Sequence, residues 1–318
     1  MSSRSKLKLT KSYGAVRIRK LVASTAETEP PRPAEDVDCL PTHSNVTSGL
    51  QRINLDASAG DLTYIHFIGH GTAIEPTSPF ASRGMGELAL VVPARDDPTN
   101  KVQYLRESEL AYSMRTMVVA GLKVTLVLDC CASGSVARDK LDRSVCYLPY
   151  DSAVDVAHPP DAERSLGSDE KCGAIRTGDR DTSLRQNWLV DPDGYTILTA
   201  CGPTEIAQEL NVNGSWHGAL SYFLLRVFAR NGRVGGKLRR IYPQLYARIK
   251  ESWPQSLPRQ KPMLYGNRNL CFFDSDTDQG YDAARIAVIS RKGGRLELEA
   301  DQAHGVCVGD EFVPQAEG

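Results

Sequence analysis

Long apolar runs, paired cysteine motifs and an excess of one charge are all missing from this sequence. No apolar stretch is long enough to span a bilayer, and the basic first twenty residues lack the apolar core of a secretory signal. Lys and Arg number 38 against 39 Asp and Glu, so the net charge is −1. That balance gives no reason to expect a nucleic-acid or membrane partner, and no feature of the sequence indicates an oligomeric state.

Cysteine is also too scarce for a disulfide scaffold, with eight in 318 residues and no CxxC pair. Two of the eight, Cys130 and Cys131, are neighbours in the chain. Because adjacent cysteines rarely bond to each other, this pair is expected to carry free thiols. The sequence therefore predicts a reducing, cytoplasmic setting.

The composition is that of a globular protein, with 41% hydrophobic and 24% charged residues. The sequence divides into three parts. Residues 1–40 include a Pro- and Glu-rich run and are predicted to be a flexible N-terminal arm, in which 15–23 alternate weakly like an edge strand. Residues 41–275 form the main domain. Residues 276–318 are a small β-rich segment with a hairpin around 292–294, and we expect the chain end to cut this segment short.

Apolar runs bounded by turn residues predict the elements of the main domain. Helices are expected over 46–55, 106–120, 218–230 and 238–253. Strands are expected over 62–68, 123–128 and 195–200, with a hairpin within 87–93 and a last strand ending at 270–273. This alternation predicts an α/β fold, a mainly parallel sheet with helices on both faces. Residues 139–193 form a long polar loop, expected to be functional or solvated.

Two motifs stand at the carboxyl ends of predicted strands, where α/β proteins place their chemistry. Gly69, His70 and Gly71 follow the first strand, and Cys131 follows the second. A thiol attacks an acyl carbon as its thiolate, so His70 is a candidate base for Cys131, and the amides of Gly71 and Cys131 are candidate oxyanion donors. Alone, each motif is more often a structural turn or buried core. Zinc on His66, His70, Cys130 and Cys131 is disfavoured by the spacing.

The segment IHFIGHGT (65–72) resembles the histidine motif of caspases and metacaspases, and LVLDCCASGS (126–135) resembles their cysteine motif, D-x-C-x-S-G. Segments 198–209, 218–222 and 260–266 are also similar to parts of the family, so the resemblance covers about 41–275. It implies a caspase-like fold and a cysteine-type endopeptidase that acts on proteins or peptides. By the same resemblance, Cys131 is the nucleophile and His70 the catalytic histidine, while Gly71 donates to the oxyanion.

Asp129 matches an acidic residue that lines the substrate pocket in metacaspases, which implies cleavage after Arg or Lys; a strand-end cap is the competing interpretation. No cofactor is predicted. Calcium at Asp139 and Asp142, as in some metacaspases, is weighed against plain surface charge, which is preferred. Self-cleavage within 139–193 is a further hypothesis, with a solvated insertion as the default.

The sequence also departs from the family pattern. The family's first strand has no counterpart in residues 1–40, and the residue after the nucleophile is Ala132, where a polar residue is common. A catalytically inactive caspase-like scaffold or signalling module is therefore the alternative function.

Overall fold

The computed structural model describes residues 16–24, 33–74, 87–94, 102–130, 148–158, 192, 194–202, 205–230, 237–253, 260–273, 288–292 and 295–298. Within these ranges, no helix is both long enough and apolar enough to cross a membrane. Cys131, Asp139 and Asp142 lie outside them, as does most of the 139–193 loop.

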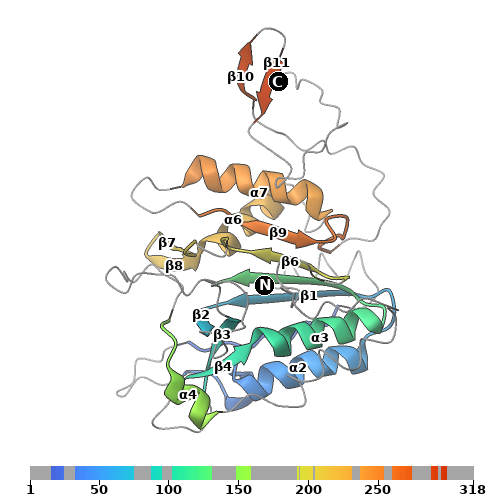
Figure 1. Ribbon diagram of the computed structural model, residues 1–318, viewed down its shortest axis with the longest axis vertical. Coiled ribbons are helices and arrows are strands. Elements are labelled where there is room, and N and C mark those ends of the chain that lie inside the picture. Colours follow the sequence, from blue (N-terminus) through green and yellow to red (C-terminus); the bar gives the residue numbers. More distant parts are fainter. Residues whose placement is uncertain are drawn as a thin grey trace, which may run out of the picture.

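A four-stranded sheet forms the centre of the domain, in the order β1-β5-β6-β9 (Figure 1). Strands β1 (Leu62–Ile68), β5 (Lys123–Asp129) and β6 (Thr196–Thr199) are parallel, and β9 (Met263–Gly266) is antiparallel to β6. The predicted mainly parallel sheet is thus confirmed. The predicted position of its last strand is wrong, since Cys271 makes only an isolated bridge to Lys237.

Helices cover both faces of this sheet, as predicted (Figure 1). On one face lie α2 (His43–Asp56) and α3 (Glu107–Val119), which are joined by His43 Nε2 and Glu109 Oε1 at 2.8 Å. On the other face lie α6 (Ala219–Arg230) and α7 (Leu238–Ser252).

The buried side chains of β5 alternate between these two layers because successive residues of a strand point to opposite faces. Val124, Leu126 and Leu128 pack in the core under α3, whereas Val127 packs with residues of α6 and α7. An apolar run therefore suits β5, which is buried on both faces.

Two smaller sheets flank the carboxyl ends of the parallel strands. Strands β2 (Gly71–Ile74), β3 (Glu87–Pro93) and β4 (Val102–Arg106) form an antiparallel sheet, so the hairpin predicted within 87–93 is instead one continuous strand. Strands β7 (Glu209–Val212) and β8 (Ser215–Gly218) form a hairpin.

The β7–β8 turn has positive φ at both central residues, 54° at Asn213 and 83° at Gly214. That geometry belongs to the type I′ turn, for which Asn-Gly is a strong signal. The hairpin is thus an element beyond those predicted above, although the Asn213–Gly214 pair signals it.

The described parts of the N-terminal arm contain a short 3-10 helix, η1 (Val37–Cys39), and no strand element. Residues 16–24 therefore do not form the weakly predicted edge strand. They run beside α2, where Arg17 and Asp56 form an ion pair at 2.8 Å. Within the described ranges β1 is thus an edge strand of the central sheet.

Beyond the main domain, β10 (Val288–Lys292) and β11 (Arg295–Leu298) pair antiparallel. This pairing is the hairpin that the sequence predicts around 292–294.

Candidate active site

The two sequence motifs meet at one edge of the central sheet. In the parallel pairing of β1 with β5, Ile68 is the partner of Asp129, and the Gly69 N–H donates to the Asp129 carbonyl oxygen over 3.4 Å. The turn that holds His70 therefore begins where β5 ends. The described chain stops at Cys130, which is 2% exposed. Cys131 is the next residue in the sequence and lies outside the described residues.

The backbone of the histidine turn is fixed by its neighbours, while the His70 side chain is exposed. The His70 carbonyl oxygen accepts from the Val91 N–H at 2.9 Å, and the Gly71 carbonyl oxygen accepts from the Leu148 N–H at 3.2 Å. Gly71 itself is buried as the first residue of β2. This arrangement holds the turn rigidly and leaves the imidazole open to solvent.

The chain that leaves β5 returns to the same turn at Leu148. A short helix then follows, α4 (Ser152–Ala157), in which Val154 is 3% exposed and packs with residues of β2, β3 and β4. Asp129 and Leu148 thus lie beside Gly69 and Gly71, on the two sides of His70.

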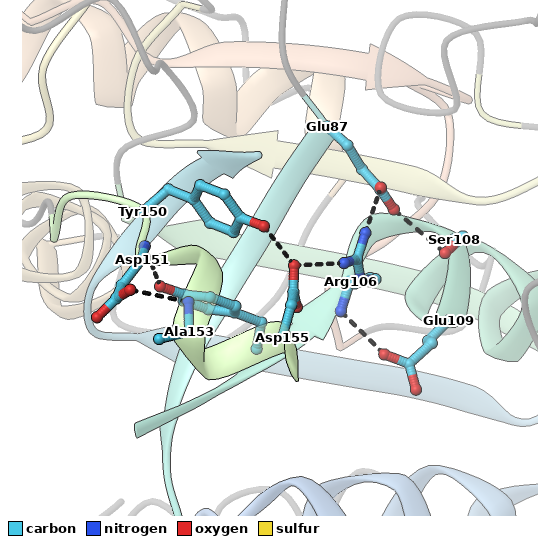
Figure 2. Close-up of polar contacts among 9 residues, drawn as sticks. Glu87, Arg106, Ser108, Glu109, Tyr150, Asp151, Ala153 and Asp155 are labelled. Atoms are coloured by element: carbon cyan, nitrogen blue, oxygen red, sulfur yellow. Dashed lines mark hydrogen bonds and ion pairs between the residues drawn. The ribbon is translucent and has the colours of Figure 1, made fainter. Parts of the chain in front are cut away.

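An ion cluster fixes α4 against β3 and β4 (Figure 2). Arg106 lies between two carboxylates, with Nη1 3.1 Å from Glu87 Oε2 and Nη2 2.7 Å from Asp155 Oδ2. The Tyr150 hydroxyl also donates to Asp155 Oδ2 at 2.6 Å, and the Ser108 hydroxyl donates to Glu87 at 3.2 Å. This cluster carries no signal in the sequence, because its members come from separate elements.

Asp129 is completely buried, at 0% exposure. Its Oδ2 accepts from the Ser221 N–H at 2.8 Å, in the first turn of α6, and a Cβ at Gly218 would overlap that oxygen. Its Oδ1 has no hydrogen-bond partner within the described chain. Asp129 thus caps α6 with one oxygen, at a helix end that favours negative charge, while the described residues leave the other oxygen without a hydrogen bond.

Burial raises the pKa of Asp129 to about 6, against the lowering effect of the hydrogen bonds from Ser221 and Leu220. The nearby carboxylate of Glu209 raises that pKa further. Glu209 belongs to β7 and pairs with Gly218, the residue that packs on Asp129. Two carboxylates are therefore near each other beside the strand end, of which only Asp129 was predicted from the sequence.

His66 lies on β1 with both ring nitrogens hydrogen-bonded. Its Nδ1 is 3.0 Å from the Tyr64 hydroxyl, and its Nε2 is 2.9 Å from Ser221 Oγ. Burial lowers the pKa of His66 to about 4, so the ring is neutral at pH 7. These bonds leave neither nitrogen for the zinc site that the sequence analysis had already disfavoured. Within the described residues no group of three or more His, Cys, Asp and Glu is placed to hold a metal.

Comparison with known proteins gives the same family as the motifs. The family model described as "Metacaspase, peptidase C14 domain" matches residues 6–139. Metacaspase-1 of Schizosaccharomyces pombe is 23% identical over 223 residues, which are 63% of this chain and 50% of that protein. Metacaspase-1 of Candida albicans is 25% identical over 225 residues, 60% of this chain and 46% of that protein.

The chain thus spans about half the length of the curated relatives it matches. A crystal structure of protein GSU0716 from Geobacter sulfurreducens aligns with a TM-score of 0.43 and 18% identity, over 71% of this chain and 74% of that one. The family match includes both the histidine turn and the Asp129–Cys130 strand end. The chain is thus similar to the metacaspases over the part that carries both motifs.

Proposed function

We propose that this chain is a cysteine-type endopeptidase in which Cys131 is the nucleophile and His70 its general base. The observation that carries the proposal is the meeting of two strand ends, since Ile68 pairs with Asp129 and the Gly69 N–H donates to the Asp129 carbonyl oxygen. His70 and Cys131 each lie two residues beyond that pair. The metacaspase match over 6–139 supports the same assignment.

The proposed reaction is an acyl transfer in two halves. His70 takes the thiol proton, and Cys131 Sγ attacks the scissile carbonyl carbon. The backbone amides of Gly71 and Cys131 donate to the oxyanion, each lowering the barrier by roughly 3 kcal/mol. The C–N bond then breaks, His70 returns its proton to the leaving amine, and a thioester remains. Water, deprotonated by His70, hydrolyses the thioester and regenerates the thiol.

Cleavage after Arg or Lys is part of the proposal, and Asp129 is its main support. A buried polar atom without a partner requires an explanation, and Asp129 Oδ1 is such an atom within the described chain. A guanidinium or ammonium group would satisfy it through a charge-assisted hydrogen bond. The negative charge of Glu209, which acts on Asp129, would favour the same cation. The cap on α6 and the substrate contact then use different oxygens of one carboxylate.

The proposed substrates are proteins and peptides, and the proposed setting is a reducing compartment such as the cytosol. A catalytic thiol must remain reduced to act as a nucleophile, and a reducing compartment keeps it so.

Fluorogenic peptides with Arg, Lys or Asp before the scissile bond test this function. We expect the wild-type chain to cleave the Arg and Lys peptides and not the Asp peptide. Cys131→Ala should abolish cleavage, and Cys130→Ala, the matched control one residue earlier, should retain it. Equal rates in wild type and Cys131→Ala would exclude Cys131 as the nucleophile. Activity lost in Cys130→Ala and kept in Cys131→Ala would show that the wrong cysteine was assigned.

One observation favours an inactive scaffold as the second candidate. Within residues 16–24 and 33–42 no strand covers the outer edge of β1, the strand that leads to His70. An exposed strand edge can pair with another chain, as a binding module would require. A folded wild-type chain without turnover of any of the three peptides would favour this second function.

A further inference from the structure

Ser221 makes two hydrogen bonds that connect α6 to both strands of the candidate site. Its hydroxyl oxygen lies 2.9 Å from His66 Nε2 on β1, and its backbone N–H donates to Asp129 Oδ2 on β5 over 2.8 Å. His66 precedes His70 by four residues. Asp129 precedes Cys131 by two. One residue of α6 therefore contacts both strands that lead to the proposed catalytic pair.

The pairing of β1 with β5 explains why His66 and Asp129 reach the same helix. His66 is the partner of Val127, whose side chain packs with residues of α6 and α7. Because alternate residues of a strand point to one face, Asp129 lies on the same face as Val127, two positions later. The parallel register thus brings both side chains to α6, although Ser221 is 155 positions from His66 in the sequence and 92 from Asp129.

The contact between His66 and Ser221 is buried, so its polar atoms need partners. Ser221 is 7% exposed, and burial lowers the pKa of His66 to about 4, so the ring is neutral at pH 7. On the other side of the ring, the Tyr64 hydroxyl lies 3.0 Å from His66 Nδ1. A neutral imidazole has one donor and one acceptor nitrogen, and each hydroxyl can take either role. Both ring nitrogens are therefore satisfied, whichever of them carries the proton.

Strand β1 depends on this bond more than the inner strands of the sheet would. Within the described residues the central sheet has the order β1-β5-β6-β9, so β1 is paired along one edge alone. An apolar side chain at position 66 would pack on α6 without a fixed partner, whereas a satisfied buried hydrogen bond specifies one arrangement. The His66–Ser221 bond therefore fixes β1 relative to α6, and the bond to Asp129 fixes β5 relative to the same helix.

We propose that His66 and Ser221 are positioning residues that hold the end of β1, and with it His70, in place against the end of β5. The inference rests on the proposed function, because that position sets the distance between His70 and Cys131. A displacement of about 1 Å between reacting groups can lower a rate about 100-fold. Loss of the His66–Ser221 bond should therefore slow the chemical step.

Hydrogen exchange on the full chain carrying Cys131→Ala tests the inference and needs no activity. We expect the amides of β1 and of Gly69 to exchange about tenfold faster in Ser221→Ala, because a buried bond is lost and His66 is left with an unsatisfied nitrogen. The Ala200 amide, which donates to a carbonyl oxygen of β5, should keep its rate. Unchanged exchange in β1 would overturn the proposal. Equal acceleration of β1 and Ala200 would show general destabilisation, and would overturn it too.

Ser113→Ala is the matched control for the lost hydroxyl. Ser113 bonds a backbone oxygen within α3, on the other face of the sheet, so its replacement should leave the exchange of β1 unchanged. Acceleration of the same size in Ser113→Ala and Ser221→Ala would show that β1 responds to the loss of any buried hydroxyl. That result would refute the inference.

A double-mutant cycle tests whether His66 acts through Ser221. His66→Leu removes the same bond from the other side, so it should accelerate β1 exchange little further once Ser221→Ala is present. Additive effects would mean that the two residues act separately, and would refute the inference. His66→Gln keeps a polar group at similar reach and should exchange at nearly the parent rate. If His66→Leu does not fold, this variant decides, and a rate as high as that of Ser221→Ala would count against the proposal.

Kinetics separate this inference from the proposed function. In active chain, His66→Leu should lower kcat for Arg peptides about tenfold or more and change KM less, because Ser221 still donates its N–H to Asp129. If wild type cleaves no peptide, the proposed function fails and hydrogen exchange still decides the inference. If wild type is active and His66→Leu leaves kcat unchanged, the positioning role fails and the peptidase stands.

Discussion

Arg106 holds α4, the helix that follows Leu148 and the bond from Leu148 to the histidine turn, and replacing Arg106 should loosen α4. Arg106→Met keeps the apolar stem but removes both ion pairs to α4 and β3, at 2.7 and 3.1 Å. Hydrogen bonds to charged groups contribute about 1.5–3 kcal/mol each when they are shielded from water. Asp155 would keep Tyr150, and Glu87 would keep Ser108, so part of the loss is recovered. We expect unfolding to become easier by about 2–3 kcal/mol in urea titrations.

The loss should be local as well as global. Hydrogen exchange should accelerate over 148–158, including the Leu148 amide that bonds the Gly71 carbonyl oxygen. Because that bond holds the histidine turn, kcat should fall with it. Arg52→Met is the control, since Arg52 is 72% exposed and 3.5 Å from Asp56, a pair worth less than about 0.5 kcal/mol. If the two variants are equally stable and the Leu148 amide exchanges at the wild-type rate, this reasoning is wrong.

Further predictions concern the carboxylate beside the strand end. Gly218→Ala should displace Asp129 and weaken cleavage of Arg peptides at least tenfold, because a Cβ at Gly218 overlaps Asp129 Oδ2. Gly49→Ala is the control, since a Cβ at Gly49 meets nothing nearer than 3.7 Å, and it should leave cleavage unchanged in the same assay. Asp129→Asn should abolish the Arg and Lys preference while the chain stays folded by circular dichroism, because the amide oxygen can still accept from α6. The raised pKa of Asp129 favours the folded state at low pH, and this contribution is lost as pH rises through about 6. The depressed pKa of His66 acts in the opposite sense, and its contribution is lost as pH falls through about 4. As pH falls from 6.5 to 4, the free energy of unfolding of His66→Gln, measured with urea, should therefore rise relative to that of wild type. An unchanged difference between the two proteins would contradict the lowered pKa of His66.

The elements that local pattern specifies were predictable. The apolar run of β5 and the helical spacing of Leu110, Met114 and Met117 are both signals that a single segment carries, and all three side chains are buried. The family motifs added the expectation that Gly69 and Asp129 end neighbouring strands, which the register of β1 with β5 agrees with.

Contacts between distant segments were not predictable in the same way. The run 87–93 looks like a hairpin in isolation, but it is one strand because β2 and β4 pair with its two edges. Ser221 reaches Asp129 across 92 positions of sequence, and only the path from β8 into α6 brings it there. Glu209 carried no sequence signal of its own, although the Asn213–Gly214 turn would have predicted the hairpin that holds it.

The energetics of Asp129 argue that its charge is not there for the cap alone. Raising its pKa from 3.8 to about 6 costs the folded chain on the order of 3 kcal/mol at neutral pH. Asn or Ser would cap α6 without that penalty, because either can accept from the same N–H. A cap would also engage whichever oxygen is available, yet Oδ1 has no partner within the described chain. A cation from the substrate would offset the penalty and occupy that oxygen, and this is the physical basis of the proposed cleavage after basic residues.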